Sequence, residues 1–369
     1  MRLLQVRCAR RVLPLARPIF TSRSVITVRE TIIVAIRDEV GRIGVGEVAP
    51  LPEFGTETLD SARYALQRIS AYMPLPPMPE KPREMGRWLS NVELDYRSLP
   101  ATYFGFQSAL LGLQCLTFGM PLHRLFPEKA RPSVPVNALV SGSSWETIQD
   151  AAGCAVEAGF RTLKIKVGTR SLTDDVNIVA RLRHAFPDVH LRLDANGAWS
   201  VPDARLFLKA VEPFEIEYIE DPVQSVSVDA LCELRRASSV PIALDDAARD
   251  LTLLLPLMRR HLVDVVVLKP ATIGAYDLMI DLTFEARRCG IDVVFSSMLE
   301  SSVGLSYIVN LAAVQGSPKR AQGVGTALLL DEDTLIQPLR PLGQDLALPD
   351  VRTLPQTLTE DLRADLGIE

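Results

Sequence analysis

The sequence predicts an α/β fold, a modified TIM barrel of the (β/α)7β type with an α+β capping domain, and three observations lead to this prediction. Strand-like apolar runs alternate with helical segments from residue 134 onward. Five of these runs end in an ionisable residue, at intervals of 28, 26, 25 and 24 residues, and a strand with its returning helix takes about 25–30 residues. Residues 1–130 do not follow this spacing, so they are expected to form a separate unit.

The strand-like runs of the second part number eight, as a closed barrel of this type requires. They cover residues 134–140, 162–167, 189–194, 216–220, 241–245, 263–269, 292–296 and 321–325. The helical segments between them cover residues 145–158, 172–185, 202–211, 228–237, 251–260, 275–288 and 302–313. No clear helix follows the eighth run, and the final segment is expected to return to the capping domain. The predicted parts are residues 1–130, 131–327 and 328–369.

The first part reads as strands and helices without a repeat. Strands are expected at residues 3–15 and 24–37, and helices at residues 58–72, 81–89 and 104–117. The first 29 residues hold seven arginines and no acid, a composition also typical of a transit peptide. We favour the strand, because no apolar leader segment is present and a second strand-like run follows at once.

Composition narrows the class of protein. The chain has 369 residues, 47% hydrophobic and 23% charged, with a net charge of −5, which is ordinary globular composition. The charge balance does not suggest a nucleic-acid partner, and the apolar runs are too short to span a membrane. Five scattered cysteines without CxxC spacing suggest reduced thiols in a cytoplasmic protein.

Three of the five strand-end residues are carboxylates, Asp194, Glu220 and Asp245. Oxygen ligands suit a hard divalent cation, and Mg²⁺ takes a few carboxylates while leaving positions for water or substrate; Mn²⁺ is the alternative. Each acid alone would more often be a helix cap or a surface residue. Three acids at evenly spaced strand ends favour a metal site.

The other two strand-end residues are lysines, Lys166 and Lys269. Lys164 and Lys166 alternate with an isoleucine, so both should point to the same face of their strand. Neighbouring cations lower one another's pKa, which would provide a neutral amine as a base. The alternative is that all three are surface lysines whose stems pack on apolar neighbours.

Beyond these residues the chain carries motifs in a fixed order: GVGEVAPLPEFGTETL at 44–59, VNAL at 136–139, KIKVG at 164–168, DANGAW at 194–199, IEDPV at 219–223, LKP at 268–270 and SSMLESSVGL at 296–305. In these motifs the chain resembles the enolase superfamily, in its muconate-lactonising subgroup, and most closely the o-succinylbenzoate synthase family. The resemblance covers essentially the whole chain. It implies Mg²⁺-dependent syn dehydration of a small carboxylate, 2-succinyl-6-hydroxy-2,4-cyclohexadiene-1-carboxylate, to 2-succinylbenzoate in menaquinone or phylloquinone biosynthesis.

The same resemblance implies roles for single residues. Asp194, Glu220 and Asp245 match the metal ligands, Lys166 the base that removes the α-proton, and Lys269 the lysine on the opposite side. Lys164 matches the residue that adjusts the pKa of Lys166. Asn196 and Asp246 would contact the metal ligands without binding the metal themselves. The family usually has Glu where this chain has Asp246, which leaves open whether Asp245 or Asp246 reaches the metal.

The resemblance also points to residues that would bind the substrate. Ser296, Ser297, Glu300, Ser301, Gly323 and Gly325 match segments that meet the succinyl or ring end of the substrate. A capping loop at residues 17–27 would close the site, and its Arg23, or else Arg29, would bind a succinyl carboxylate. Each arginine could equally pair with a surface acid, and the glycines and serines could equally serve turns and helix caps.

Several alternatives stay open. An N-succinylamino acid racemase uses the same two lysines, and assembly of several copies is not decided by the sequence. A dipeptide epimerase would need an acidic motif after the eighth strand, and a mandelate-type racemase a histidine on the seventh; the sequence has neither. A muconate cycloisomerase fits the loop motifs less well. From other classes, a Schiff-base aldolase barrel or a non-catalytic binding barrel would have no use for three metal-spaced acids.

Overall fold

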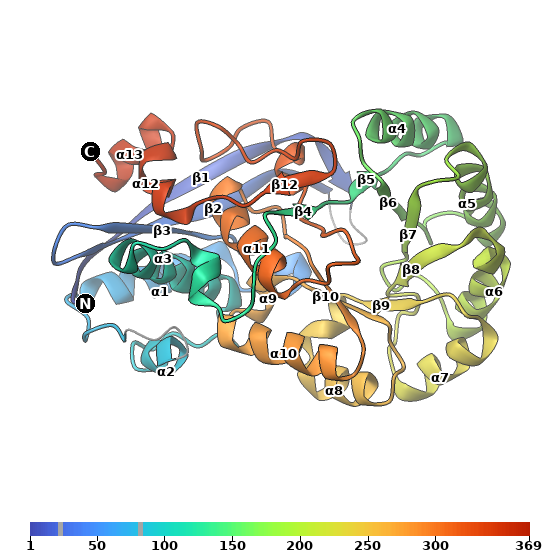
Figure 1. Cartoon of the computed structure of the whole chain (residues 1–369), viewed down its shortest axis with the longest axis horizontal. Helices are drawn as coiled ribbons and strands as arrows, with labels where there is room; N and C mark the ends of the chain where they lie inside the picture. Colours follow the sequence, from blue (N-terminus) through green and yellow to red (C-terminus); the bar gives the residue numbers. More distant parts are fainter. Residues whose placement is uncertain (21–24, 80–83) are drawn as a thin grey trace.

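The computed structural model describes residues 1–20, 25–79 and 84–369. Its two parts are a three-stranded antiparallel sheet with helices packed on it, and a curled seven-stranded parallel sheet with helices around its outside (Figure 1). Both chain ends lie on the side of the small sheet (Figure 1). The predicted fold class is confirmed: α/β, with an antiparallel capping sheet beside an enolase-like barrel.

The capping sheet has the order β1-β2-β3, with β1 at Leu3–Phe20, β2 at Val25–Asp38 and β3 at Ile43–Val48. The first strand therefore runs past residue 15, where the sequence suggested that it would end. Its pairing with β2 is irregular between Pro14 and Ile19, a stretch in which Pro14 and Pro18 have no N–H to donate.

Three helices accompany this sheet: α1 (Leu59–Ala71), α2 (Met85–Ser90) and α3 (Pro100–Phe118). The predicted start of the second helix falls in residues 80–83, outside the described residues. Helix α3 packs against β3 through glycines, since a Cβ on Gly46 would lie 2.1 Å from the Gly105 carbonyl oxygen. Although α3 is long and apolar, no helix in the described ranges combines the length and apolarity that a bilayer crossing needs.

The parallel sheet has the order β11-β10-β9-β8-β7-β6-β5. Its strands are β5 (Ala138–Val140), β6 (Thr162–Lys166), β7 (His190–Asp194), β8 (Ile216–Glu220), β9 (Ile242–Leu244), β10 (Val265–Leu268) and β11 (Asp292–Phe295). The helices are α4 (Trp145–Glu157), α5 (Leu172–Ala185), α6 (Val201–Val211), α7 (Val228–Ala237), α8 (Leu251–Arg259), α9 (Pro270–Ile273), α10 (Tyr276–Arg288) and α11 (Ser302–Gln315). Since all seven strands run parallel, their carboxyl ends share one face.

The eighth strand-like run closes the barrel without forming a regular strand. Gln322 bridges to Val136 and Gly323 bridges to Ser296, as isolated pairs. Glycine is a poor strand former, and there is little room, because a Cβ on Gly323 would lie 2.6 Å from the Ser296 Oγ. The predicted strand at 134–140 is likewise divided, into β4 (Ser133–Pro135) and β5.

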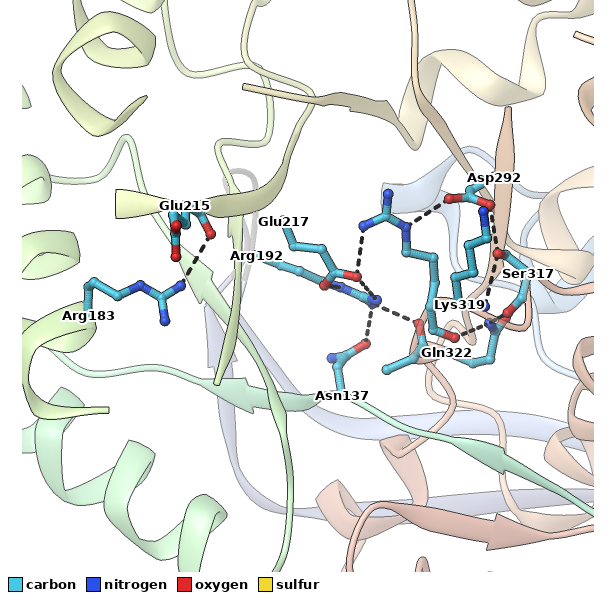
Figure 2. A network of polar contacts seen from close by, with 11 residues as sticks. Asn137, Arg183, Arg192, Glu215, Glu217, Asp292, Ser317, Lys319 and Gln322 are labelled. Atoms are coloured by element: carbon cyan, nitrogen blue, oxygen red, sulfur yellow. Dashed lines mark hydrogen bonds and ion pairs between the residues drawn. The ribbon is translucent and has the colours of Figure 1, made fainter. Parts of the chain in front are cut away.

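Buried polar side chains reinforce this closure (Figure 2). The guanidinium of Arg192, inside the barrel and 0% exposed, donates to the Ala321 carbonyl oxygen at 2.8 Å. It also pairs with Glu217, whose carboxylate accepts from Arg320 at 3.0 Å. Figure 2 traces this network from Asn137 to Asp292. The last strand-like segment is therefore held by side chains as well as by backbone.

The C-terminal segment contacts the capping sheet. It contains β12 (Asp345–Ala347), α12 (Leu354–Thr357) and α13 (Glu360–Leu366). Leu330 bridges to Leu15 of β1, and Asp365 of α13 pairs with Arg11 at 2.9 Å. The return of the tail to the cap agrees with the expected architecture, while the boundaries at 130/131 and 327/328 stay a prediction.

Candidate active site

The strand ends of the barrel bring the ionisable residues together. The parallel register places Lys166, Asp194 and Glu220 side by side as the last residues of β6, β7 and β8. Asp245 and Lys269 directly follow β9 and β10. The equal spacing in the sequence therefore corresponds to neighbouring positions on one face.

These residues line a cavity of about 980 Å³. Lys164 and Lys166 both face it, as their alternation along β6 predicts, together with Lys269 and the carboxylates of Asp194, Glu220 and Asp245. The cap also contributes to the wall, through Ala16, Arg17, Pro18, Ile19, Ile26, Leu51, Glu53 and Phe54. The cavity thus lies where cap and barrel meet.

Lys164 lies between two of the acids. Its Nζ is 2.8 Å from Asp194 Oδ2 and 2.6 Å from Glu220 Oε1. Burial lowers the pKa of Lys164, but the carboxylates of Asp194, Glu220 and Asp245 outweigh burial and bring the pKa well above its usual value. The expectation that neighbouring amines would lower the pKa is therefore wrong for Lys164, because acids surround it more closely than cations do.

Lys269 has a different environment. Its ammonium pairs with Asp245 and lies 4.9 Å from the centre of the Phe54 ring. Phe54 belongs to the cap, and Arg249 from the loop after β9 donates to the Phe54 carbonyl oxygen at 2.9 Å. The cap therefore contributes an aromatic face directly above a barrel lysine.

The carboxylates fit a divalent cation. Glu220 is 1% exposed, and its Oε2 has no hydrogen-bond partner among the residues that the structure describes. Burial raises the pKa of Glu220 well above its usual value, and the neighbouring Asp194 and Asp245 raise it further against the opposing Lys164. Such an oxygen gains most from a cation, and an all-oxygen set suits Mg²⁺, Mn²⁺ or Ca²⁺.

A second acidic grouping lies beside it. Asp221, Asp245 and Asp246 each bring a carboxylate oxygen within 4.8 Å of the others. Asp221 accepts the backbone N–H groups of Asp245 and Asp246 at 3.1 and 2.9 Å. Burial and the neighbouring Asp245 raise the pKa of Asp221 to about 7. Sequence reasoning used the IEDPV motif only for Glu220 and missed Asp221, which stands next to it.

The residues expected on the substrate side divide into two groups. Ser296, Ser297, Gly323 and Gly325 line the cavity, as do Asn196 and Asp246. Glu300 and Ser301 are buried away from it: Glu300 accepts the Met298 N–H, and Ser301 donates to Glu47. Both were expected to meet the substrate because they continue the serine motif, but helix α11 begins there and directs them toward the cap.

Of the two candidate arginines, the structure describes Arg29. Arg23 lies outside the described residues. Arg29 is 2% exposed and donates to four backbone carbonyl oxygens, those of Glu30, Ala49, Pro50 and Met298. Its donors are directed at backbone, so a succinyl carboxylate is not its partner.

Comparison with known proteins agrees with this geometry. The family described as "Enolase C-terminal domain-like" matches residues 146–354, and "MenC, N-terminal domain" matches residues 3–74. An o-succinylbenzoate synthase of Thermobifida fusca is 33% identical over 348 residues, which is 94% of this chain and 89% of the relative. The chain belongs to the o-succinylbenzoate synthase family of the enolase superfamily.

A second synthase and a solved structure agree with this assignment. The synthase of Mycolicibacterium smegmatis is 37% identical over 67% of this chain and 76% of its own length. The solved muconate lactonizing enzyme of Pseudomonas fluorescens superposes with a TM-score of 0.88 over 99% of this chain and 98% of the other, at 21% identity, and so shares the fold. Within the superfamily fold, the acidic residues at the ends of β8 and β9 form the divalent-metal site.

Proposed function

We propose that this chain is a metal-dependent hydro-lyase that converts 2-succinyl-6-hydroxy-2,4-cyclohexadiene-1-carboxylate into 2-succinylbenzoate for menaquinone or phylloquinone synthesis. One observation carries the proposal. Lys166 and Lys269 line the same cavity from β6 and the end of β10, strands separated by three others in the sheet, with the strand-end carboxylates between them. Membership in the o-succinylbenzoate synthase family supports it.

We assign Asp194, Glu220 and Asp245 as ligands of Mg²⁺, with Mn²⁺ as a second candidate. A bound cation would supply positive charge that stabilises the enediolate formed when the substrate's α-proton leaves. Asp221 is better suited to hold the backbone of Asp245 and Asp246, because both of its oxygens already accept N–H groups from that loop. Asn196 and Asp246 line the cavity beside the proposed ligands, and the backbone N–H of Asn196 donates to Asp194 Oδ1 at 3.1 Å.

In this mechanism Lys166 removes the α-proton. The same lysine then returns this proton to the hydroxyl group on the same face of the substrate ring, and the hydroxyl group leaves as water. One base is therefore sufficient for the dehydration. Lys269 faces the substrate from the other side of the cavity, where its ammonium stabilises the negative charge that develops. Lys164 sets the charge around Lys166 and holds Asp194 and Glu220 in place.

The succinyl tail needs a cation of its own. Among the described residues that line the cavity, the arginines are Arg17 and Arg170. Arg170 donates to Asp175 at 3.0 Å and to the Gly142 carbonyl oxygen at 2.6 Å, so its geometry is fixed by the protein. Arg17 is exposed at the end of β1, and we propose that it binds the succinyl carboxylate. Ser296, Ser297, Gly323 and Gly325 would then meet the rest of the substrate.

The decisive experiment measures dehydration beside racemisation of N-succinylamino acids. Racemisation is the second candidate function, since a lysine on each side of the cavity also suits two-base proton transfer at one carbon. Dehydration with Mg²⁺ supports the proposal, and turnover of N-succinylamino acids alone would refute it. Loss of activity with chelator, restored by Mg²⁺, separates both from a Schiff-base barrel, which borohydride would trap instead.

The proposal includes a cytoplasmic location. All five cysteines are free thiols in the structure, which suits a reducing compartment. The proposed partner is a small carboxylate substrate, and size-exclusion chromatography with light scattering would establish whether copies of the chain assemble.

A further inference from the structure

Two loops from distant parts of the chain form one wall of the cavity. The first follows β3 in the cap and contributes Leu51, Glu53 and Phe54. The second follows β11 in the barrel and contributes Met298 and Leu299, after the two serines. The width of the cavity at this wall depends on how these loops are held relative to each other.

Arg29 of β2 contacts both loops. Its Nε donates to the Met298 carbonyl oxygen at 3.3 Å, in the barrel loop. Its two terminal nitrogens donate to Pro50 at 2.6 Å and to Ala49, at the start of the cap loop. A planar guanidinium presents its donors in a fixed fork, so these bonds set the distance between the two backbones.

Acidic side chains balance the buried charge without using its donors. Glu300 and Glu47 both attract the Arg29 guanidinium, as do Glu53 and Glu30, while burial lowers the pKa of Arg29. Glu300 accepts the backbone N–H of Met298. The backbone of Met298 is thus held at its carbonyl oxygen by Arg29 and at its N–H by Glu300.

The barrel loop is also in an unusual conformation. Leu299 has a φ of 65°, a left-handed backbone conformation that is strained for a leucine. Such a conformation persists only where surrounding contacts determine it. The hydrogen bonds to its neighbour Met298 are contacts of this kind.

We propose that Arg29 is a positioning residue for the substrate cavity: it fixes the cap loop at Ala49 and Pro50 against the barrel loop at Met298. The lysines and the carboxylates lie at the ends of barrel strands or directly after them, and of these residues Lys269 meets the cap loop, through the Phe54 ring. Loosening the Arg29 contact should therefore weaken substrate binding more than the chemical step. The inference deepens the proposed function and relies on it only for the identity of the substrate.

The test compares Arg29→Lys with Arg131→Lys. Arg131 is a matched control, because it also donates to backbone carbonyl oxygens, those of Ala312 and Ser317 among others, and does not line the cavity. We expect Arg29→Lys to raise KM about tenfold, as loops displaced by a fraction of an ångström would, with kcat changed by less than the roughly fivefold that full loss of the Phe54–Lys269 contact would cause. Arg131→Lys should leave both constants near wild type. Equal constants for the two variants, or a fall in kcat at constant KM, would overturn the proposal.

A second measurement does not depend on activity. Amide hydrogen exchange should accelerate in Arg29→Lys at residues 49–55 and 297–301 together, and at neither segment in Arg131→Lys. Acceleration of one segment alone, or of the whole cap, would show that Arg29 does not join the loops. If the wild type dehydrates nothing, the proposed function fails, yet the exchange result still decides whether Arg29 holds the loops.

Discussion

The barrel strand ends and the cap loops line the same cavity but are built by different rules. On the barrel side, each reactive group stands at the end of a strand, and neighbours in space are about one βα unit apart in sequence. On the cap side, Arg29 meets a carbonyl 269 residues away, and Phe54 meets Lys269. This difference indicates that the strand ends of the barrel provide the reacting groups, whereas the contacts between cap and barrel determine which substrate binds.

The largest effect is expected from Lys166→Ala, on the barrel side of the cavity. Removal of the proposed base should reduce kcat by at least about a thousandfold, while Mg²⁺ titrated by calorimetry still binds. Lys209→Ala, on the outer helix α6, is the control and should behave as wild type. Near-normal turnover in Lys166→Ala would move the base elsewhere.

Glu220→Gln tests the carboxylate side. The carboxylate of Glu220, whose buried Oε2 has no partner in the described part of the chain, would become a neutral amide. Mg²⁺ should therefore bind more weakly, and activity at fixed Mg²⁺ should fall about a hundredfold or more. High Mg²⁺ should restore part of the loss. If neither affinity nor activity changes, the ligands are to be sought at Asp221, Asp245 and Asp246 instead.

These two predictions rest on what the sequence alone could provide. Residues at strand ends are readable because the period of a βα unit is set by local geometry, and that gave Lys166, Asp194, Glu220, Asp245 and Lys269. The polar residues that orient them are not periodic. Asp221 could have been found from its place beside Glu220, but nothing local indicates that Phe54 covers a lysine or that Arg29 joins two loops.

The eighth strand and the start of α11 illustrate a second limit. A strand was predicted at 321–325 from its place in the repeat, whereas the chain forms two isolated bridges there. Glu300 and Ser301 were placed at the substrate by their motif, yet they point to Met298 and Glu47. Which way a side chain points after a strand ends depends on tertiary packing, which no spacing reports.

The cap side of the comparison is tested by Arg17→Ala. Loss of the proposed partner of the succinyl carboxylate should raise KM about tenfold, since one charge-assisted hydrogen bond is lost at an exposed site. Arg63→Ala, an exposed arginine on α1, supplies the matched loss of charge. An unchanged KM would place the succinyl group elsewhere.

Phe54→Leu should have a smaller effect, on kcat. The aromatic face over Lys269 is worth about 1 kcal/mol to the ammonium, which corresponds to about fivefold in rate. Phe54→Tyr keeps the face and should retain activity, and Phe284→Leu, an aromatic on the outer helix α10, controls for hydrophobic loss. Equal rates for the leucine and tyrosine variants would show that the aromatic ring does not contribute to kcat.

The last prediction concerns stability, not rate. Burial, then Glu47, raises the pKa of Glu300 to about 7 against the partial opposition of Arg29. Because the folded state holds this proton more tightly, stability contributed by the protonated form is lost as pH rises from about 4.5 to about 7.

Residue 300 cannot titrate in Glu300→Gln. As pH rises from about 4.5 to about 7, the free energy of unfolding of this variant should therefore increase relative to wild type by up to about 3 kcal/mol. Above about pH 7 the difference between the two proteins should stay constant. Urea unfolding between pH 5 and 8 measures the difference. Parallel curves for the two proteins would mean that Glu300 does not titrate in this interval.

The closure of the barrel by Gln322, Gly323 and Arg192 has a consequence for the chain outside its reaction. Without this segment, β5 and β11 would each present an unpaired edge, and such edges recruit strands from other molecules. Two isolated bridges and one buried guanidinium cover both edges at once. A variant that lost Arg192 would therefore be expected to expose these edges and to aggregate on heating or storage.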